Sequence, residues 1–200
     1  LTEAHVDCAN MRRKYSTLCA QKKEYGEILN QLKTITFDSS SSAMTAAIHE
    51  TSEALETLSA SVDKDNYQQL LFQRGRIKKL YGMKTAALKM SKDQATYNLL
   101  IYKGAEEDFA RLIRLFPTFY EAYLAQGQLF RLYSKTIQAF LQMTFITDKE
   151  TIETYLNDIL WNTYNKNAEH LFKTVIQHSP NLAPFAWSEL ADLYTDMQDP

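Results

Sequence analysis

Apolar residues recur along this chain at mixed spacings of three and four positions, which is the period of an α-helix that packs along one side. The pattern predicts four helices in the first part of the chain, over residues 2–36, 43–62, 67–90 and 92–115. Four consecutive serines within 37-FDSSSSAMT-45 interrupt the period and predict a loop. The chain holds only five glycines and four prolines, which favours helices joined by short loops over a turn-rich β fold.

Short polar side chains precede three of these predicted helices. Their oxygens accept hydrogen bonds from the free N–H groups at a helix start. Ser42 is therefore the expected cap of the second helix, Asp63 or Asp65 of the third, and Ser91 of the fourth.

One spacing of small, aromatic and proline residues occurs twice, 63 positions apart. Alanine is followed four positions later by phenylalanine and then by proline, at Ala105, Phe109 and Pro117 and again at Ala168, Phe172 and Pro180. A small residue lets one helix approach its neighbour closely, and an aromatic ring one turn later fills the space between them. Proline then ends the helix because it has no N–H and restricts the residue before it.

A second pattern follows each of these prolines. The order is aromatic, small and aromatic in both 123-YLAQGQLF-130 and 187-WSELADLY-194. Together the two patterns resemble the tetratricopeptide repeat, a helix-turn-helix unit of about 34 residues. Its first helix carries W-x2-L-G-x2-Y and its second carries A-x3-F. In this chain Ala191 stands in place of the glycine of the last unit, and Gln126 in place of the leucine of the preceding one.

The resemblance sets the expected boundaries of the repeats. A short unit of two helices is expected from Tyr120 to Asp148, with Ala139 on its second helix. A unit of ordinary length follows from Lys149 to Leu182, and a last first helix from Pro184 to Met197.

The expected fold is therefore all-α, with antiparallel helical hairpins stacked as a short right-handed tetratricopeptide-like superhelix, or α-solenoid. We expect one domain over residues 1–200, with long or degenerate helices over 1–91 and repeats over 92–200. The chain begins without Met and stops after an amphipathic pattern, so we expect it to be a piece of a longer protein.

The resemblance implies a concave groove that receives a partner peptide or helix. Signature residues are expected to pack between helices, and these are Tyr123, Gly127, Phe130, Trp187, Ala191 and Tyr194. Positions between them on the first helices are the expected partner contacts, namely Glu121, Leu124, Gln128, Arg131, Glu153, Asn157, Leu160, Ser188 and Asp192. The expected function is that of a non-catalytic adaptor or scaffold for protein partners.

Other classes of function find little support. A net charge of −2 makes nucleic acid an unexpected partner. The basic residues clustered between Arg74 and Lys92 are interpreted as a solvated helical face. No catalytic motif or phosphate-binding glycine loop occurs, so we expect no enzyme activity and no cofactor. Cys8 and Cys19 are interpreted as buried, reduced thiols.

No apolar run approaches the roughly 20 residues that span a bilayer, so membrane insertion is not expected. The default expectation is a soluble intracellular protein, in the cytoplasm. The abundant aromatic residues keep one alternative open. The chain would then be a structural subunit of a large complex or a homo-oligomer, with its aromatic faces permanently covered.

Overall fold

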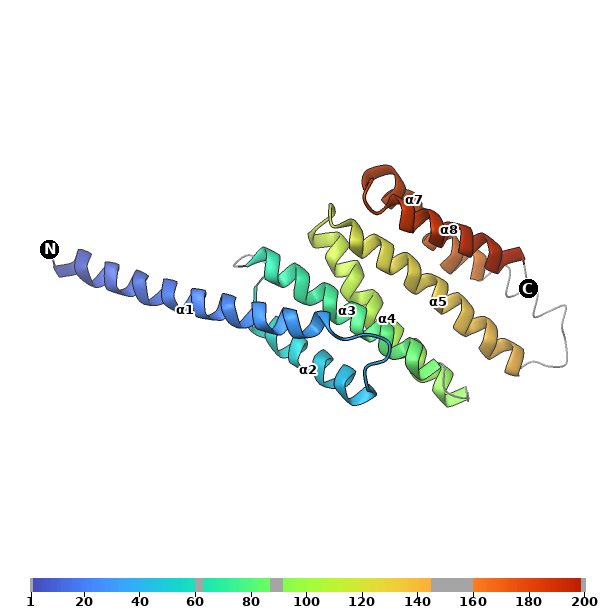
Figure 1. The fold of residues 1–200 in the computed structure, drawn as a ribbon, viewed down its shortest axis with the longest axis horizontal. Coiled ribbons are helices and arrows are strands. Elements are labelled where there is room, and N and C mark those ends of the chain that lie inside the picture. Colours follow the sequence, from blue (N-terminus) through green and yellow to red (C-terminus); the bar gives the residue numbers. More distant parts are fainter. Residues whose placement is uncertain (1, 60–62, 87–91, 145–159, 199–200) are drawn as a thin grey trace.

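The structure is a computed structural model that describes residues 2–59, 63–86, 92–144 and 160–198. All secondary-structure elements among these residues are helices, and no strand occurs among them (Figure 1). The elements in chain order are α1 Thr2–Lys33, α2 Ser41–Thr57, α3 Lys64–Ala86, α4 Lys92–Leu115, α5 Tyr120–Thr144, the π-helix η1 Leu160–Asn165, α7 Lys166–His178 and α8 Ala183–Gln198. The predicted fold class, all-α, is thus confirmed for the described part of the chain.

Side-chain caps begin two of the helices. The hydroxyl of Ser40 accepts a hydrogen bond from the N–H of Ala43 at 3.1 Å, so α2 begins two residues before the predicted start. Ser42, the predicted cap, lies inside α2. The carboxylate of Asp63 accepts from the N–H of Asn66 at 3.2 Å, which confirms one of the two caps predicted for α3. Ser91 lies outside the described residues.

The helices pack in chain order. Each contacts its neighbour in sequence, from α2 on α3 through α5 on α7 to α7 on α8. In addition, α1 contacts α3, α3 contacts α5, and α5 contacts α8. Figure 1 shows this succession from the blue end to the red end, with the N-terminal half of α1 projecting beyond the other helices. One cluster of buried apolar side chains runs through the described helices, from Tyr25 on α1 to Leu193 on α8.

Glycines set the distance between α3 and α4. A Cβ atom added at Gly75 would lie 2.8 Å from Cε1 of Phe109, and one added at Gly82 would collide with the ring of Tyr102. The pairing runs in opposite directions along the two helices, so α3 and α4 are antiparallel. The two glycines let aromatic rings of α4 rest directly on the backbone of α3.

The same contact recurs between α5 and α7. A Cβ atom added at Gly127 on α5 would lie 2.5 Å from Cε1 of Phe172 on α7. Phe109 and Phe172 are both fully buried, and so are the alanines four positions before them, Ala105 and Ala168. The repeated Ala-x3-Phe spacing therefore corresponds to a repeated helix-on-helix contact.

The predicted helical hairpin over Tyr120–Asp148 is wrong. A single helix of 25 residues, α5, runs from Tyr120 to Thr144 and carries Ala139. The segment after Gly127 contains no proline, glycine or other strong turn residue, so nothing in the local sequence interrupts the helix. Ala139 therefore lies on the same helix as the first-helix pattern and not on a following one.

Candidate partner-binding surface

The signature residues of α5 and α8 have opposite environments. Gly127 and Phe130 on α5 are buried, as predicted, and Tyr123 is half-buried. On α8, Trp187 is 58% exposed, Tyr194 is 37% exposed, and Ala191 is exposed as well. The prediction that these three residues pack between helices is wrong. They form one exposed face, called the α8 aromatic face from here on.

A common register relates α3, α5 and α8. Residues of these helices correspond at separations of 52 and 64 positions. Two sets of corresponding residues are buried in all three helices: Leu70, Ala122 and Ala186, and Ile77, Leu129 and Leu193. Since α8 contacts mainly α7 and α5, these positions on α8 face inward.

A third set of corresponding residues, Gly75, Gly127 and Ala191, has different environments in the three helices. Gly75 and Gly127 are covered by Phe109 and Phe172. Ala191, which corresponds to both glycines, is exposed. The apolar side of α8 is thus broader than the surface that α7 and α5 cover, and the α8 aromatic face is the uncovered part.

One edge of the α8 aromatic face is fixed by α7. The hydroxyl of Tyr194 donates a hydrogen bond to the carboxylate of Glu169 at 2.7 Å, and the ammonium of Lys173 pairs with the same carboxylate. Hydrogen bonds from Lys173 and Tyr194 lower the pKa of Glu169. The hydrogen bond between Tyr194 and Glu169 also raises the pKa of Tyr194. The aromatic face therefore begins directly beside α7.

A row of polar side chains links α3, α5 and α8. The ammonium of Lys79 donates to Oε1 of Gln128 at 2.6 Å, and the amide of Gln128 donates to Oε1 of Glu189 at 2.8 Å. Arg131 donates to Glu189 and, at 2.8 Å, to Asp196. These five residues are called the polar row. It ties together three helices that are distant in sequence.

Burial and charge shift the ionisation of this row. Burial lowers the pKa of Lys79 to about 8; the carboxylate of Glu189 opposes this shift and the guanidinium of Arg76 adds to it. Burial raises the pKa of Asp196, but hydrogen bonds from Arg131 and Lys135 outweigh it and leave that pKa below its ordinary value. The row is therefore sensitive to pH at its lysine end.

The structure brings together three of the nine predicted groove residues. Gln128 and Arg131 belong to the polar row, and Nη1 of Arg131 lies 3.4 Å from Oδ2 of Asp192. Glu121 and Ser188 are exposed, and Leu124 is half-buried against the core. The other three are not placed as side chains: Leu160 is the first residue of η1, and Glu153 and Asn157 lie outside the described residues.

The basic residues of α3 are not the solvated face that the sequence predicted. Arg74 and Lys78 both pair with the carboxylate of Asp108 on α4, which is 4% exposed, at 2.5 and 2.8 Å. Arg76 donates to the backbone carbonyls of Leu32 and Ile35, at the end of α1. These cations hold α3 to its neighbours. The spacing of Arg74 and Lys78, four positions on one helix face, was the available signal for a shared partner.

Lys84 and Cys19 also lie in environments other than those predicted. Lys84 donates to the carbonyls of Phe37 and Ser39 and so fixes the serine-rich loop to α3. Cys19 is exposed on α1, so its interpretation as a buried thiol is wrong. The side chain of Cys8 is not described.

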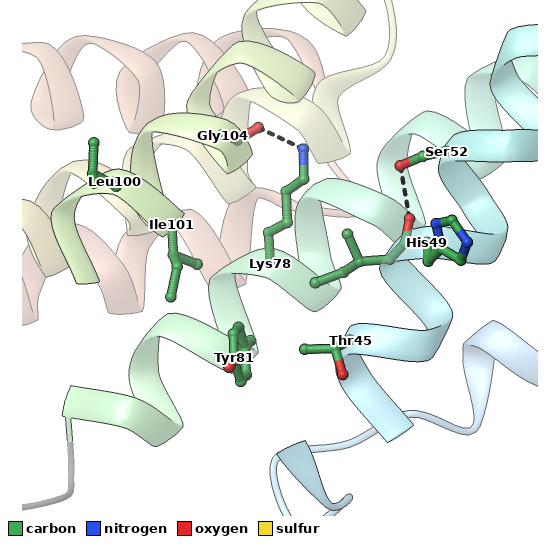
Figure 2. Close-up of a pocket in the computed structure, with 9 residues that line it drawn as sticks. Thr45, His49, Ser52, Lys78, Tyr81, Leu100, Ile101 and Gly104 are labelled. Atoms are coloured by element: carbon green, nitrogen blue, oxygen red, sulfur yellow. Dashed lines mark hydrogen bonds between the residues drawn. The ribbon is translucent and has the colours of Figure 1, made fainter. Parts of the chain in front are cut away.

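A largely apolar pocket of about 460 Å³ lies between α2, α3 and α4 (Figure 2). The lining residues are Thr45, Ile48, His49, Ser52, Lys78, Tyr81, Leu100, Ile101 and Gly104. Figure 2 shows the Lys78 ammonium turned to the carbonyl of Gly104, which accepts its hydrogen bond at 3.1 Å. Ser52 donates to the carbonyl of Ile48 and accepts from Arg74. With these polar groups engaged, the pocket suits an apolar group and offers no activated nucleophile.

The described residues contain no group of three or more His, Cys, Asp or Glu side chains placed to hold a metal ion. None of the described helices combines the length and apolar character needed to cross a membrane.

Comparison of the chain with known protein families, characterised proteins and solved structures finds no match in any of the three. The tetratricopeptide-like pattern is therefore a resemblance carried by the residues themselves.

Proposed function

We propose that this chain is a non-catalytic scaffold that binds protein partners. Its helices would stack as a short, right-handed, tetratricopeptide-like solenoid. The repeated Gly/Phe contact of α3 with α4 and of α5 with α7 supports this proposal, and so does the common register of α3, α5 and α8. In such an array each unit covers the apolar face of its neighbour.

The observation that carries the proposal is the exposure of the α8 aromatic face. Trp187 and Tyr194 expose large rings two helical turns apart on this face, and Phe185, on another side of α8, is 62% exposed. Tryptophan and tyrosine are enriched where protein partners bind, because they supply a large contact area together with a polar group. Covering this face with protein removes that surface from water.

The predicted groove residues remain a proposal for a second contact surface. Gln128 and Arg131 already bind Lys79, Glu189 and Asp196. A partner that enters the groove would have to replace these bonds with bonds of its own, which lowers its net gain in free energy. Ser188 is exposed and would meet a partner without that cost, and Asp192 would give up only its 3.4 Å contact with Arg131.

The same exposed rings favour one other candidate, a structural subunit of a complex or homo-oligomer. Obligate interfaces resemble a domain core cut in half, and large aromatic side chains are typical of them. Sedimentation of the purified chain over a range of concentrations distinguishes the two. A monomer at all concentrations favours the adaptor, whereas a dimer abolished by Trp187→Ser favours self-assembly.

Capture experiments test the proposed function. The tagged chain is incubated with a lysate of the cells that produce it, and bound proteins are quantified by mass spectrometry. The variant Trp187→Ser/Ala191→Arg alters the α8 aromatic face, and Asp192→Arg alters the groove. Leu100→Ser is the matched control, because it removes another exposed apolar side chain, on α4.

We expect a small set of proteins that is retained by Leu100→Ser and lost with the α8 double variant. Loss with Asp192→Arg alone would move the contact to the groove and keep the binding function. If wild-type and all variants capture nothing above background, the scaffold proposal is contradicted.

A further inference from the structure

Two helices of this chain cover their predecessors in the same way. On α4, Ala105, Phe109 and Leu112 are fully buried, and on α7 the corresponding residues, Ala168, Phe172 and Val175, are fully buried as well. In each case the phenylalanine rests on a glycine of the preceding helix, at Gly75 or Gly127. The chain thus contains two examples of one interface, in which a helix of the form small-x3-aromatic-x2-aliphatic covers a helix with a small central residue.

The α8 aromatic face is the third surface of this kind. Trp187, Ala191 and Tyr194 correspond in register to Tyr123, Gly127 and Phe130 on α5. There Phe172 of α7 covers Gly127, and Tyr164 of η1 contacts Phe130. The bond from Tyr194 to Glu169 places this face beside α7 and so continuous with the existing stack. A helix seated on it would extend the succession of α4 and α7 by one member.

The central residue of this surface selects the incoming side chain. At Gly127 no Cβ atom fits beneath Phe172, because it would lie 2.5 Å from the ring. Ala191 has that Cβ atom. A phenylalanine ring in the same seat would therefore be pushed outward, whereas a narrower aliphatic side chain such as leucine can pack beside the methyl group.

From this geometry we infer that the α8 aromatic face binds an amphipathic helix of a partner protein. That helix carries a small residue and, four positions later, a leucine-like side chain, and it packs on α8 as α7 packs on α5. The inference rests on the proposed scaffold function and deepens it by naming the chemistry of the partner. A second copy of this chain is a competing occupant, and the test distinguishes it.

The test uses Trp187 as a reporter. The full 200-residue chain carries Trp161→Phe, so that Trp187 is its single tryptophan. The probe is a peptide of residues 163–180, cross-linked between positions 166 and 170, which are exposed on α7. The cross-link is needed because short isolated helices are marginal in water. Three peptides differ only at position 172, with Phe, Leu or Ala.

We expect the leucine peptide to bind and to shift the Trp187 emission to shorter wavelength. The alanine peptide is expected to bind at least about tenfold more weakly, since the residue that fills the seat is missing. The phenylalanine peptide is expected to bind more weakly than the leucine peptide. In the protein variant Ala191→Gly this order should reverse, because the space for the ring is restored.

A second arm guards against a peptide that fails to bind only because it is poorly ordered. Residues 163–182 with Phe172→Leu, a segment without tryptophan, are joined behind Pro200 through a flexible linker, which raises their effective concentration to the millimolar range. We expect a blue-shifted Trp187 emission, protected from a soluble quencher. The matched control has alanine at the same position and should leave Trp187 accessible.

Three results would overturn the inference: an equal response to all three peptides, no response in both arms, or a concentration-dependent dimer that already shields Trp187. Loss of captured proteins with the α8 double variant, together with failure of both helix arms, would remove this inference and leave the scaffold function standing. If the helix peptides bind but no protein is captured from the lysate, the α8 aromatic face is a helix-binding surface and the scaffold function is contradicted.

Discussion

The same face is present on α5 and on α8, yet one copy is buried and the other is exposed. On α5, Gly127 lies under Phe172 and Phe130 packs near Tyr164. On α8, no helix of the described part of the chain lies over Trp187 and Tyr194 in this way, and the hydrogen bond from Tyr194 to Glu169 fixes the edge of their face. The covering helix decides the environment, although the two helices carry nearly the same pattern.

The pattern of aromatic and small residues thus specifies a surface that can pack against a helix, but it does not specify whether that surface is covered. Inward-facing positions are buried on both helices, at Ala122 and Leu129 and at Ala186 and Leu193. The outward-facing positions depend on the next helix. Substitutions at matched positions of α5, α7 and α8 should therefore have very different effects.

The largest difference is expected between Phe172→Ala and Trp187→Ala. Phe172 is fully buried, and its truncation should lower the free energy of unfolding by about 3–5 kcal/mol. Trp187 is largely exposed, and its truncation should change stability by no more than about 0.5 kcal/mol. Urea denaturation followed by circular dichroism measures both. Equal losses of unfolding free energy in the two variants would mean that Trp187 is as buried as Phe172.

The next effect concerns pH and the polar row. The pKa of Lys79 is lowered from 10.5 to about 8 in the folded chain, so between these values the unfolded chain binds more protons. Stability contributed by Lys79 therefore rises as pH increases from about 8 to 10.5, by roughly 3 kcal/mol at about 1.4 kcal/mol per pKa unit. Below pH 8 lysine is charged in both states and this contribution is flat.

The check is the difference in unfolding free energy between wild-type and Lys79→Met, measured by denaturation from pH 7 to 10.5. As pH rises, the free energy of unfolding of the wild-type chain should increase relative to that of Lys79→Met. Lys23→Met is the control, because the side chain of Lys23 is exposed and should give no such trend. A flat difference for Lys79→Met would contradict the burial of this ammonium.

A smaller effect separates Gly127 from Ala191. Gly127→Ala should lower the free energy of unfolding by about 1–2 kcal/mol, because crowding of the Phe172 ring outweighs the gain of up to about 1 kcal/mol in helix propensity. Ala191→Leu adds more atoms at a position that is exposed among the described helices, so its effect should stay within about 0.5 kcal/mol. Thermal melting of both variants is sufficient. A larger loss for Ala191→Leu would show that the α8 face is already covered.

The smallest effect is expected in the polar row on α5 and α8. Arg131 is 13% exposed and binds Glu189 and Asp196. Arg131→Gln should lower the free energy of unfolding by about 1 kcal/mol, at the upper end for ion pairs near the surface. Lys23→Gln breaks a fully solvated pair and should have no measurable effect. Urea denaturation at low salt makes the comparison, and an unchanged Arg131→Gln would mean that the row does not hold α8.

Local signals predicted most of the helix boundaries. Pro117 separates α4 from α5, Asp63 caps α3, and Ala105 and Phe109 mark a helix face that the structure buries. These features depend on a few neighbouring residues, which is why the sequence reveals them. The length of α5 does not follow the length of a repeat unit, because no turn residue after Gly127 ends the helix.

Features that depend on distant residues could not be predicted. Gly75 has the same role as Gly127, but its surroundings, 71-LFQRGRIK-78, lack the aromatic signature. The polar row joins residues 49 to 65 positions apart. Exposure of Trp187 depends on which helices contact α8, and its local pattern matches that of a buried position.

The most direct test of the central claim is the solvent accessibility of Trp187. The chain with Trp161→Phe is measured by fluorescence emission and by quenching with a soluble quencher, over a range of protein concentrations. We expect emission close to that of free tryptophan and efficient quenching at every concentration. A blue-shifted, protected emission in the dilute monomer would show instead that the aromatic face of α8 is already buried.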